Sequence, residues 1–321
     1  MPTALLSVIV CTHNPRPDYL RRTLDALAAQ TLPVERWELL LIDNASTKPL
    51  TDSVDLSWHP RSRLLVEKTP GLTAARLCGI AAAAAPILLF VDDDNELSPH
   101  YLATTLEIFN AHPRIGCIGA GVIRPEFETI PPQELKPYLC YLALREIAED
   151  RWSNRPEDNI TPWGAGLAVR ADVARRYSSE MLASPLRSRL DRSGSSLLSG
   201  GDDEFTWVAC AMGYGKGLFS SLGLTHLISA KRVEKDYLLR LVEGVSASHA
   251  ILAHLHGITP GEDPPVSLLS ALSLLLRGRL ASALLQANRA LVWRRTPALE
   301  RAFATAVRRG REKARAIIAS V

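Results

Sequence analysis

The chain has 321 residues, of which 47% are hydrophobic and 22% are charged, the composition of an ordinary globular protein with a sizeable core. Its length allows one large domain or a catalytic domain with an appendage. No apolar stretch reaches the length of a membrane span, and no aromatic–basic interleaving or known motif points to nucleic acid as a partner.

Two continuous apolar runs near the N-terminus, residues 5–11 and 38–42, predict buried β-strands. A helix with Leu20, Leu24 and Leu27 on one face is predicted between them. Polar residues follow each strand, Thr12-His13-Asn14 after the first and Asp43-Asn44-Ala45-Ser46 after the second. This β-α-β order with polar strand ends is the layout of a nucleotide-binding half.

The phosphate-binding loops of two common nucleotide folds are missing. Neither Gly-x-Gly-x-x-Gly nor Gly-x-x-x-x-Gly-Lys-Ser/Thr follows either strand. Without a glycine-rich cradle, a bound diphosphate would need a metal ion to balance its charge.

Three adjacent acids follow the next buried strand. A short strand at 64–66 and a helix over 74–85 that carries Arg76 lead to an apolar strand at 87–91, and Asp92-Asp93-Asp94-Asn95 comes directly after it. Acids gathered at a strand end repel one another, and a hard divalent cation neutralises them through oxygen ligands. The alternatives are a solvated acidic turn and, for Arg76, a surface charge rather than a ligand contact.

The middle of the chain is predicted to be less regular. Ser98-Pro99 is expected to cap a helix, and residues 116–123 to form a strand. Prolines interrupt residues 124–162, which read as an insertion or a lid over the site. Trp163-Gly164 follows this segment, and Trp163 fits either a stacking platform or a buried structural residue.

A second acidic cluster, Gly200-Gly201-Asp202-Asp203, is predicted to begin a helix. A Gly-Gly turn exposes backbone N–H groups there and places carboxylates at the positive end of the helix dipole, which could also be a plain charge preference. Residues 214–221 are predicted to be the last strand, with Thr225-His226 after it.

The chain is predicted to be helical from Val233 to its end, with segments at 266–276, 280–293 and 299–318. From Arg277 onward it has eleven basic and two acidic residues, so this tail carries +9 and the rest −6 of the net +3. The division expected is 1–232 for a catalytic domain and 233–321 for a basic helical extension. The extension could bind a membrane surface, form a homodimer or only cap the domain.

Four of these pieces together resemble the family 2 glycosyltransferases of the GT-A fold, over roughly residues 5–245. They are 7–14, 43–46, 71–76 and 90–94. The resemblance implies an α/β fold with a Rossmann-like, mostly parallel sheet flanked by helices. It also implies inverting transfer of a sugar from a nucleotide-diphosphate donor, UDP-sugars first, to the hydroxyl of a sugar or lipid-linked sugar in bacterial polysaccharide or glycolipid synthesis.

The resemblance also assigns roles to residues. Asp203 matches the general base of a Gly-Glu-Asp motif in which Asp202 here replaces the glutamate. In the other cluster, the alternation of side chains along a strand would turn Asp93 away from Asp92 and Asp94. The implied set is the donor-nucleotide residues Thr12, Asn14, Asp43, Arg76, Asp92 and Asp93; Asp94 and His226 for Mg²⁺ or Mn²⁺; Trp163, Gly164 and Asp202 for the acceptor; and Arg232 for the diphosphate.

Two other functions fit the same residues less well. A nucleotidyltransferase would need a glycine-rich basic loop after the first strand, and a non-catalytic sugar-nucleotide-binding protein would not need both acidic clusters.

Five dispersed cysteines without a Cys-x-x-Cys pair predict free, buried thiols in a reducing compartment. A cytoplasmic location, with peripheral contact at the inner face of the membrane, is therefore expected.

Overall fold

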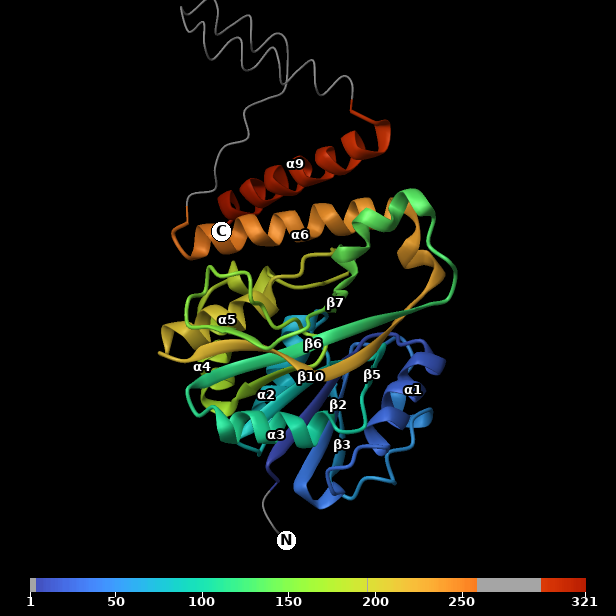
Figure 1. Ribbon diagram of the computed structural model, residues 1–321, viewed down its shortest axis with the longest axis vertical. Helices are drawn as coiled ribbons and strands as arrows, with labels where there is room; N and C mark the ends of the chain where they lie inside the picture. The colour runs from blue at the N-terminus through green and yellow to red at the C-terminus, as the bar shows by residue number, and fades with distance from the viewer. Residues whose placement is uncertain (1–3, 195, 259–295) are drawn as a thin grey trace, which may run out of the picture.

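The computed structural model describes residues 4–194, 196–258 and 296–321. Within these residues, one mixed β-sheet is covered by helices on both faces, and two long C-terminal helices form a further layer (Figure 1). The strands are β1 (Leu6–Thr12), β2 (Trp37–Asn44), β3 (Ser62–Glu67), β4 (Ile87–Asp92), β5 (Asn95–Leu97), β6 (Ile115–Phe127), β7 (Arg145–Glu146), β8 (Arg151–Ser153), β9 (Leu167–Arg170) and β10 (Gly215–Ile228).

The sheet has two halves that differ in strand direction. Its order is β3-β2-β1-β4-β9-β6-β10-β5, with β7 beside β6 and β8 beside β10. The first four strands pair in parallel, β9 is antiparallel to both of its neighbours, and β6 and β10 are again parallel to each other. The expected α/β class with helices flanking a central sheet is confirmed, and parallel pairing dominates the half that carries the nucleotide-binding pattern.

Both faces of the parallel half are buried. Along β1, Val8 and Val10 belong to one apolar cluster and Ile9 to the other, because successive side chains of a strand point to opposite faces. Helices α1 and α3 cover the first face, and α2, α4 and α5 cover the second. The helices are α1 (Pro17–Ala28), α2 (Leu72–Ala82), α3 (Tyr101–Ala111), α4 (Ala171–Ala183), α5 (Gly201–Ala211), α6 (Lys235–Leu255) and α9 (Ala298–Ala319).

Short 3-10 turns connect several of these elements. They are η1 (Val34–Arg36), η2 (Leu50–Asp52), η3 (Gln133–Leu142), η4 (Arg187–Arg189) and η5 (Ala230–Val233). The irregular segment expected at 124–162 contains η3, β7 and β8, which add to the β6–β10 region. Its role as a lid stays a prediction.

Several expected boundaries are wrong. β10 continues to Ile228, so Thr225-His226 lies within the last strand; a register shift between Phe219 and Gly223 lets the polar end of β10 pair with the extension of β6. Ser98-Pro99 does not cap α3, which begins at Tyr101 without a side-chain cap. The five cysteines are free as expected, but Cys117 alone is fully buried and Cys140 is exposed.

The C-terminal helices share their apolar contacts with the rest of the molecule. Ile251 and Ala314 belong to the cluster that covers one face of the sheet, and Phe303 packs in a third cluster with Leu135 and Ile228. In Figure 1, α9 lies along the far side of α6. The division at residue 232 stays a prediction, and the expected segments at 266–276 and 280–293 lie outside the described residues. None of the described helices is long and apolar enough to cross a membrane.

Candidate active site

The carboxyl ends of three parallel strands bring the first motifs together. The register places Thr12 of β1 beside Asp43 of β2, and Cys11 beside Asp92 at the end of β4. In open α/β sheets, ligands bind beyond these strand ends. The polar residues predicted from separate segments of the sequence therefore line one edge of the sheet.

Asp93 faces β1 rather than solvent, because the Thr12 hydroxyl donates a hydrogen bond to its carboxylate. β4 ends at Asp92, and Asp93-Asp94 forms a turn, so strand alternation does not fix the direction of Asp93. Burial and the neighbouring Asp94 raise the pKa of Asp93 to about 7. The same two causes raise the pKa of Asp92. Burial and mutual repulsion therefore disfavour the ionised forms of Asp92 and Asp93, and a cationic group bound beside them would favour those forms.

Asp94 meets two side chains from β10 and the turn after it. Its Oδ2 lies 2.6 Å from Arg232 Nη1 and 3.5 Å from His226 Nε2. Burial alone would raise the pKa of Asp94, but His226 and Arg232 outweigh it and hold that pKa below its usual range. β5 and β10 create this arrangement, because they pair Asn95, the residue after Asp94, with His226.

A divalent cation suits this pair of side chains. A carboxylate oxygen and an imidazole nitrogen are ligands that Mn²⁺ accepts, and Mg²⁺ is commonly held by one or two carboxylates together with substrate phosphates. Among the described residues, no three His, Cys, Asp or Glu side chains gather around one point. A cation held here would therefore take its remaining ligands from substrate and water.

Asp43 and Asn14 hold the loops that follow β1 and β2. The Asp43 carboxylate accepts hydrogen bonds from the Ser46 and Leu50 amides, both at 3.2 Å, and is buried. Asn14, with a positive φ of 48°, accepts hydrogen bonds from the amide and hydroxyl of Thr47 at 2.9 and 2.8 Å. Both residues thus fix the loop after β2, and their contact with a nucleoside stays a prediction.

Arg76 is the centre of a buried ionic network rather than a surface charge. Its side chain is 3% exposed and pairs with Asp202 and with Asp191, the latter at 3.0 Å. Thr73 also donates to Asp191 at 3.1 Å, and Asp191 accepts the Gly201 amide at 3.0 Å. The network ties the start of α2 to the start of α5. Sequence reasoning missed Asp191, because it is an isolated acid outside every motif.

Two glycines make room for this network. The Gly164 amide donates to Asp202 at 2.7 Å, and a Cβ on Gly164 would lie 2.5 Å from Arg76 Nη2 and 3.0 Å from both Asp202 oxygens. A Cβ on Gly201 would collide with the Asp191 carboxylate. Gly164 and Asp202, predicted to touch an acceptor, are thus joined to each other and to Arg76.

Asp203 lies in the first turn of α5, next to this network. Burial and the nearby Asp202 carboxylate raise the pKa of Asp203 to about 7. Arg76 and Asp202 also act electrostatically on Asp92, lowering and raising its pKa respectively. The two acidic clusters, 108 positions apart as Asp94 and Asp202, are therefore near enough in the fold for Asp202 to act electrostatically on Asp92. A carboxyl group poised near neutrality is suited to general base chemistry.

Trp163 is half-buried and precedes Gly164, which contacts Asp202. The Arg145 guanidinium lies 3.6 Å from its ring centroid, a cation–π contact, and Arg145 is itself held by the carbonyls of Ala120 and Thr161. The Trp163 ring also packs against the apolar cluster under α1 and α3. Trp163 thus has the structural contacts of a core residue, and its stacking on an acceptor stays a prediction.

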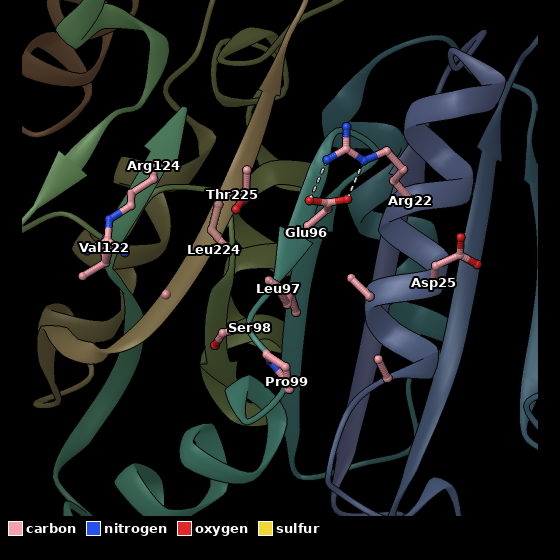
Figure 2. Close-up of a pocket in the computed structure, with 13 residues that line it drawn as sticks. Arg22, Asp25, Glu96, Leu97, Ser98, Pro99, Val122, Arg124, Leu224 and Thr225 are labelled. Carbon is pink, nitrogen blue, oxygen red and sulfur yellow. Dashed lines mark hydrogen bonds and ion pairs between the residues drawn. The ribbon is translucent and has the colours of Figure 1, made fainter. Parts of the chain in front are cut away.

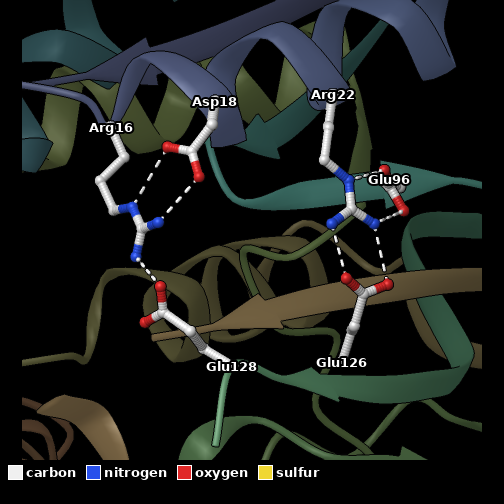
Figure 3. Close-up of polar contacts among 6 residues, drawn as sticks. All are labelled: Arg16, Asp18, Arg22, Glu96, Glu126 and Glu128. Atoms are coloured by element: carbon white, nitrogen blue, oxygen red, sulfur yellow. Dashed lines mark hydrogen bonds and ion pairs between the residues drawn. The ribbon is translucent and has the colours of Figure 1, made fainter. Parts of the chain in front are cut away.

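Two arginines, Arg16 just before α1 and Arg22 within it, connect this helix to β5 and to the end of β6. Arg22 binds Glu96 of β5 through two nitrogens at 2.6 and 3.0 Å, and Glu126 of β6 through two at 2.6 and 2.8 Å (Figure 3). Arg16 pairs with Asp18 and with Glu128. These ion pairs, here named the α1 clamp, fix β5 and the end of β6 relative to the β1–α1 loop.

A groove of about 480 Å³ lies between α1, β5 and the β6–β10 pair (Figure 2). Glu96 and Thr225, which pair across β5 and β10, both line it. The adjacent pair, Asn95 and His226, faces Asp94 on the opposite side of this ribbon, because side chains alternate along a strand. The groove is therefore separated from the acidic cluster by β5 and β10.

Comparisons with known proteins agree with this geometry. The family model described as glycosyl transferase family 2 matches residues 7–176, more than half of the chain. A validoxylamine A glucosyltransferase of Streptomyces hygroscopicus subsp. jinggangensis is 29% identical over 218 residues, covering 63% of this chain and 48% of the relative. The succinoglycan biosynthesis protein ExoW of Rhizobium meliloti is 33% identical over 104 residues, covering 31% and 32%.

A solved structure of S. aureus TarS 1-349 in complex with UDP-GlcNAc is also similar, with 16% identity, a TM-score of 0.46, and coverage of 78% of this chain and 71% of that chain. The chain spans about half the length or less of the curated relatives described above. The family match covers most of β1, all of β2 and β4, and the acidic turn after β4, which supply the part of the site before residue 176. Because the family model matches more than half of the chain, the chain belongs to glycosyl transferase family 2.

Proposed function

We propose that this protein transfers a sugar, with inversion, from a nucleotide-diphosphate donor to an acceptor hydroxyl. The observation that carries the proposal is the surroundings of Asp203: its pKa of about 7 suits a base, and it follows Asp202, whose charge acts on Asp92 of the acidic turn. Family membership supports glycosyl transfer and sets aside the nucleotidyltransferase alternative. The family's inverting chemistry gives each of these groups a task.

Asp203 would remove the proton of the acceptor hydroxyl as its oxygen attacks the anomeric carbon. The new carbon–oxygen bond forms on the face opposite the departing diphosphate, and the bond to the diphosphate breaks through an oxocarbenium-like state, as in glycoside chemistry generally. The proton ends on the Asp203 carboxylate and the electron pair on the diphosphate. A positioned base of this kind contributes about 10²–10⁴-fold to the rate.

The charge of the leaving diphosphate is the second requirement. Asp94 and His226 would hold Mg²⁺ or Mn²⁺, which when bound supplies a Lewis acid for that charge. Arg232, which contacts both residues, would bind the diphosphate oxygens as a fork of N–H donors. Thr12, Asn14 and Asp43, at the ends of β1 and β2 or just after them, would hold the nucleoside.

The donor and the product are proposed at the level of a class. UDP-sugars are the first candidates, and the acceptor would be a sugar or lipid-linked sugar in polysaccharide or glycolipid synthesis. One relative is a succinoglycan biosynthesis protein, which supports a polysaccharide product. The other relative, a glucosyltransferase, supports a hexose donor.

A panel of nucleotide sugars tests this proposal. Each is incubated with the protein and Mn²⁺ or Mg²⁺, or with EDTA, and thermal stabilisation and nucleotide release are measured. At least one donor is expected to stabilise the protein and to be hydrolysed slowly to the free nucleotide diphosphate. Stabilisation without any release, with acceptors present, would favour the non-catalytic alternative.

A further inference from the structure

Both oxygens of Asp94 are already engaged by side chains of this protein. Asn95 Nδ2 donates to Oδ1 at 3.0 Å, and Arg232 Nη1 donates to Oδ2 at 2.6 Å. The same Nη1 lies 3.0 Å from His226 Nε2. A guanidinium nitrogen thus stands between the two atoms that a cation would use, so Arg232 and a metal ion cannot both occupy this position.

The pairing of Arg232 with Asp94 is buried but incomplete. The two side chains are 15% and 18% exposed. Among the described residues, Arg232 Nε and His226 Nδ1 are buried nitrogens without a hydrogen-bond partner. Buried polar atoms usually have partners, so the position of Arg232 between Asp94 and His226 leaves two nitrogens unsatisfied and is not the best arrangement for either side chain.

The backbone around Arg232 is fixed at both ends of η5. The Ala230 amide donates to Glu128 Oε2 at 2.8 Å, and Glu128 is held in turn by Arg16 of the α1 clamp at 2.9 Å. Val233, at the other end, is buried. With the turn fixed in this way, a departure of Arg232 from Asp94 would be a rotation of its side chain rather than a movement of the backbone.

We propose that Arg232 is a gate on the cation site. It occupies the position between Asp94 and His226 in the nucleotide-free protein, and a diphosphate draws it away and so opens the site to the metal ion. The gate rests on the proposed function, since it uses the same diphosphate and cation. Nucleotide and metal then bind cooperatively, and each raises the affinity for the other by the same factor.

Binding of Mn²⁺ to the full-length, nucleotide-free protein tests the gate without any transfer reaction. Free Mn²⁺ is measured by electron paramagnetic resonance during titration of the wild type, Arg232→Gln and Lys231→Gln. Arg232→Gln is expected to bind Mn²⁺ at least about fivefold more tightly, the lower end of ordinary coupling between sites. Lys231→Gln removes the same charge from the adjacent exposed residue and is expected to match the wild type.

A second titration includes saturating UDP. UDP is expected to tighten Mn²⁺ binding in the wild type by a larger factor than in Arg232→Gln, because the variant has no gate to open. Equal or weaker Mn²⁺ binding by Arg232→Gln without UDP would overturn the gate, as would the absence of Mn²⁺ binding in every form. Either result leaves sugar transfer to be judged separately by nucleotide release from the donor panel.

Discussion

Asp203 owes its proposed role to its surroundings rather than to its residue type. Burial and the adjacent Asp202 disfavour its ionised form, while Lys216 and Thr161 act in the opposite direction, and the pKa settles at about 7. A carboxylate with an ordinary pKa would be a weak base for a hydroxyl proton. The raised pKa increases the basicity of Asp203 while leaving much of it ionised near neutral pH.

The pH dependence of kcat/KM follows from this pKa. Asp203 must be deprotonated to act, so kcat/KM is expected to fall about tenfold per pH unit below pH 7 and to level off above it. Nucleotide release from a saturating acceptor and a limiting donor measures this profile. A profile without an acidic limb near pH 7 would remove Asp203 as the ionising group.

Asp191 is expected to be a structural partner of Arg76. Both side chains are 3% exposed, so Asp191→Ala leaves the buried guanidinium with Asp202 as its remaining acid. Loss of one partner of a buried ion pair costs about 3 kcal/mol of unfolding free energy. Urea unfolding measures this loss, with the exposed Glu149→Gln as a control expected to stay within about 0.5 kcal/mol. A loss as small as that of the control would contradict the network.

The two kinds of site residue differ in how far the sequence reveals them. Asp92, Asp93 and Asp94 are adjacent and follow an apolar strand, so pattern alone marks them. Asp191 meets Arg76 across 115 positions and has no motif of its own. Only folding brings such a pair together, and the sequence of one chain carries no local signal for it.

At the scale of elements, the strands that the sequence predicts well are those formed because both of their faces are buried. β1, β2 and β4 are continuous apolar runs because both faces of the parallel half are buried. β6 and β10 extend beyond their apolar parts, to Phe127 and Ile228, since each pairs with the polar end of the other. A search for apolar runs does not detect this polar extension. The sequence therefore predicts His226 to lie after the strand rather than within it.

The α1 clamp predicts a stability effect specific to Arg22. Its guanidinium binds Glu96 and Glu126 through paired nitrogen–oxygen contacts, whereas Arg124 makes a single exposed contact with Glu146 near the same groove. Arg22→Gln is expected to cost about 1 kcal/mol, the upper end for partly exposed pairs, and Arg124→Gln less than about 0.5 kcal/mol. Denaturant unfolding of both variants decides this, and equal losses would mean that the clamp adds nothing.

At the scale of the whole molecule, α9 separates its apolar residues from its basic ones. Phe303, Ala306 and Ala314 are buried, whereas Arg308, Arg309 and Arg315 are exposed. Removal of the tail would also remove these buried contacts, so charge substitution is a cleaner test of membrane contact than truncation. If α9 only caps the domain or forms a homodimer, the exposed arginines are not needed for binding to vesicles.

Replacement of Arg308, Arg309 and Arg315 by Gln is expected to weaken binding to anionic vesicles. Each basic residue near such a surface contributes about 1 kcal/mol, so the triple variant should lose about 100-fold in partitioning. Co-sedimentation measures this, and Arg21, Arg114 and Arg175, exposed elsewhere, supply a triple control of equal charge. Wild-type protein that co-sediments more with neutral than with anionic vesicles, or with neither kind, would contradict membrane contact.

Asp203→Asn tests the central claim, that this residue is the base of a sugar transfer. Donor binding by calorimetry is expected to stay near wild type, while nucleotide release in the presence of acceptor falls by about 10²–10⁴-fold. Asp236→Asn, an exposed acid in the first turn of α6, is the matched control and is expected to keep full turnover. Turnover by Asp203→Asn equal to that of the control would contradict the account.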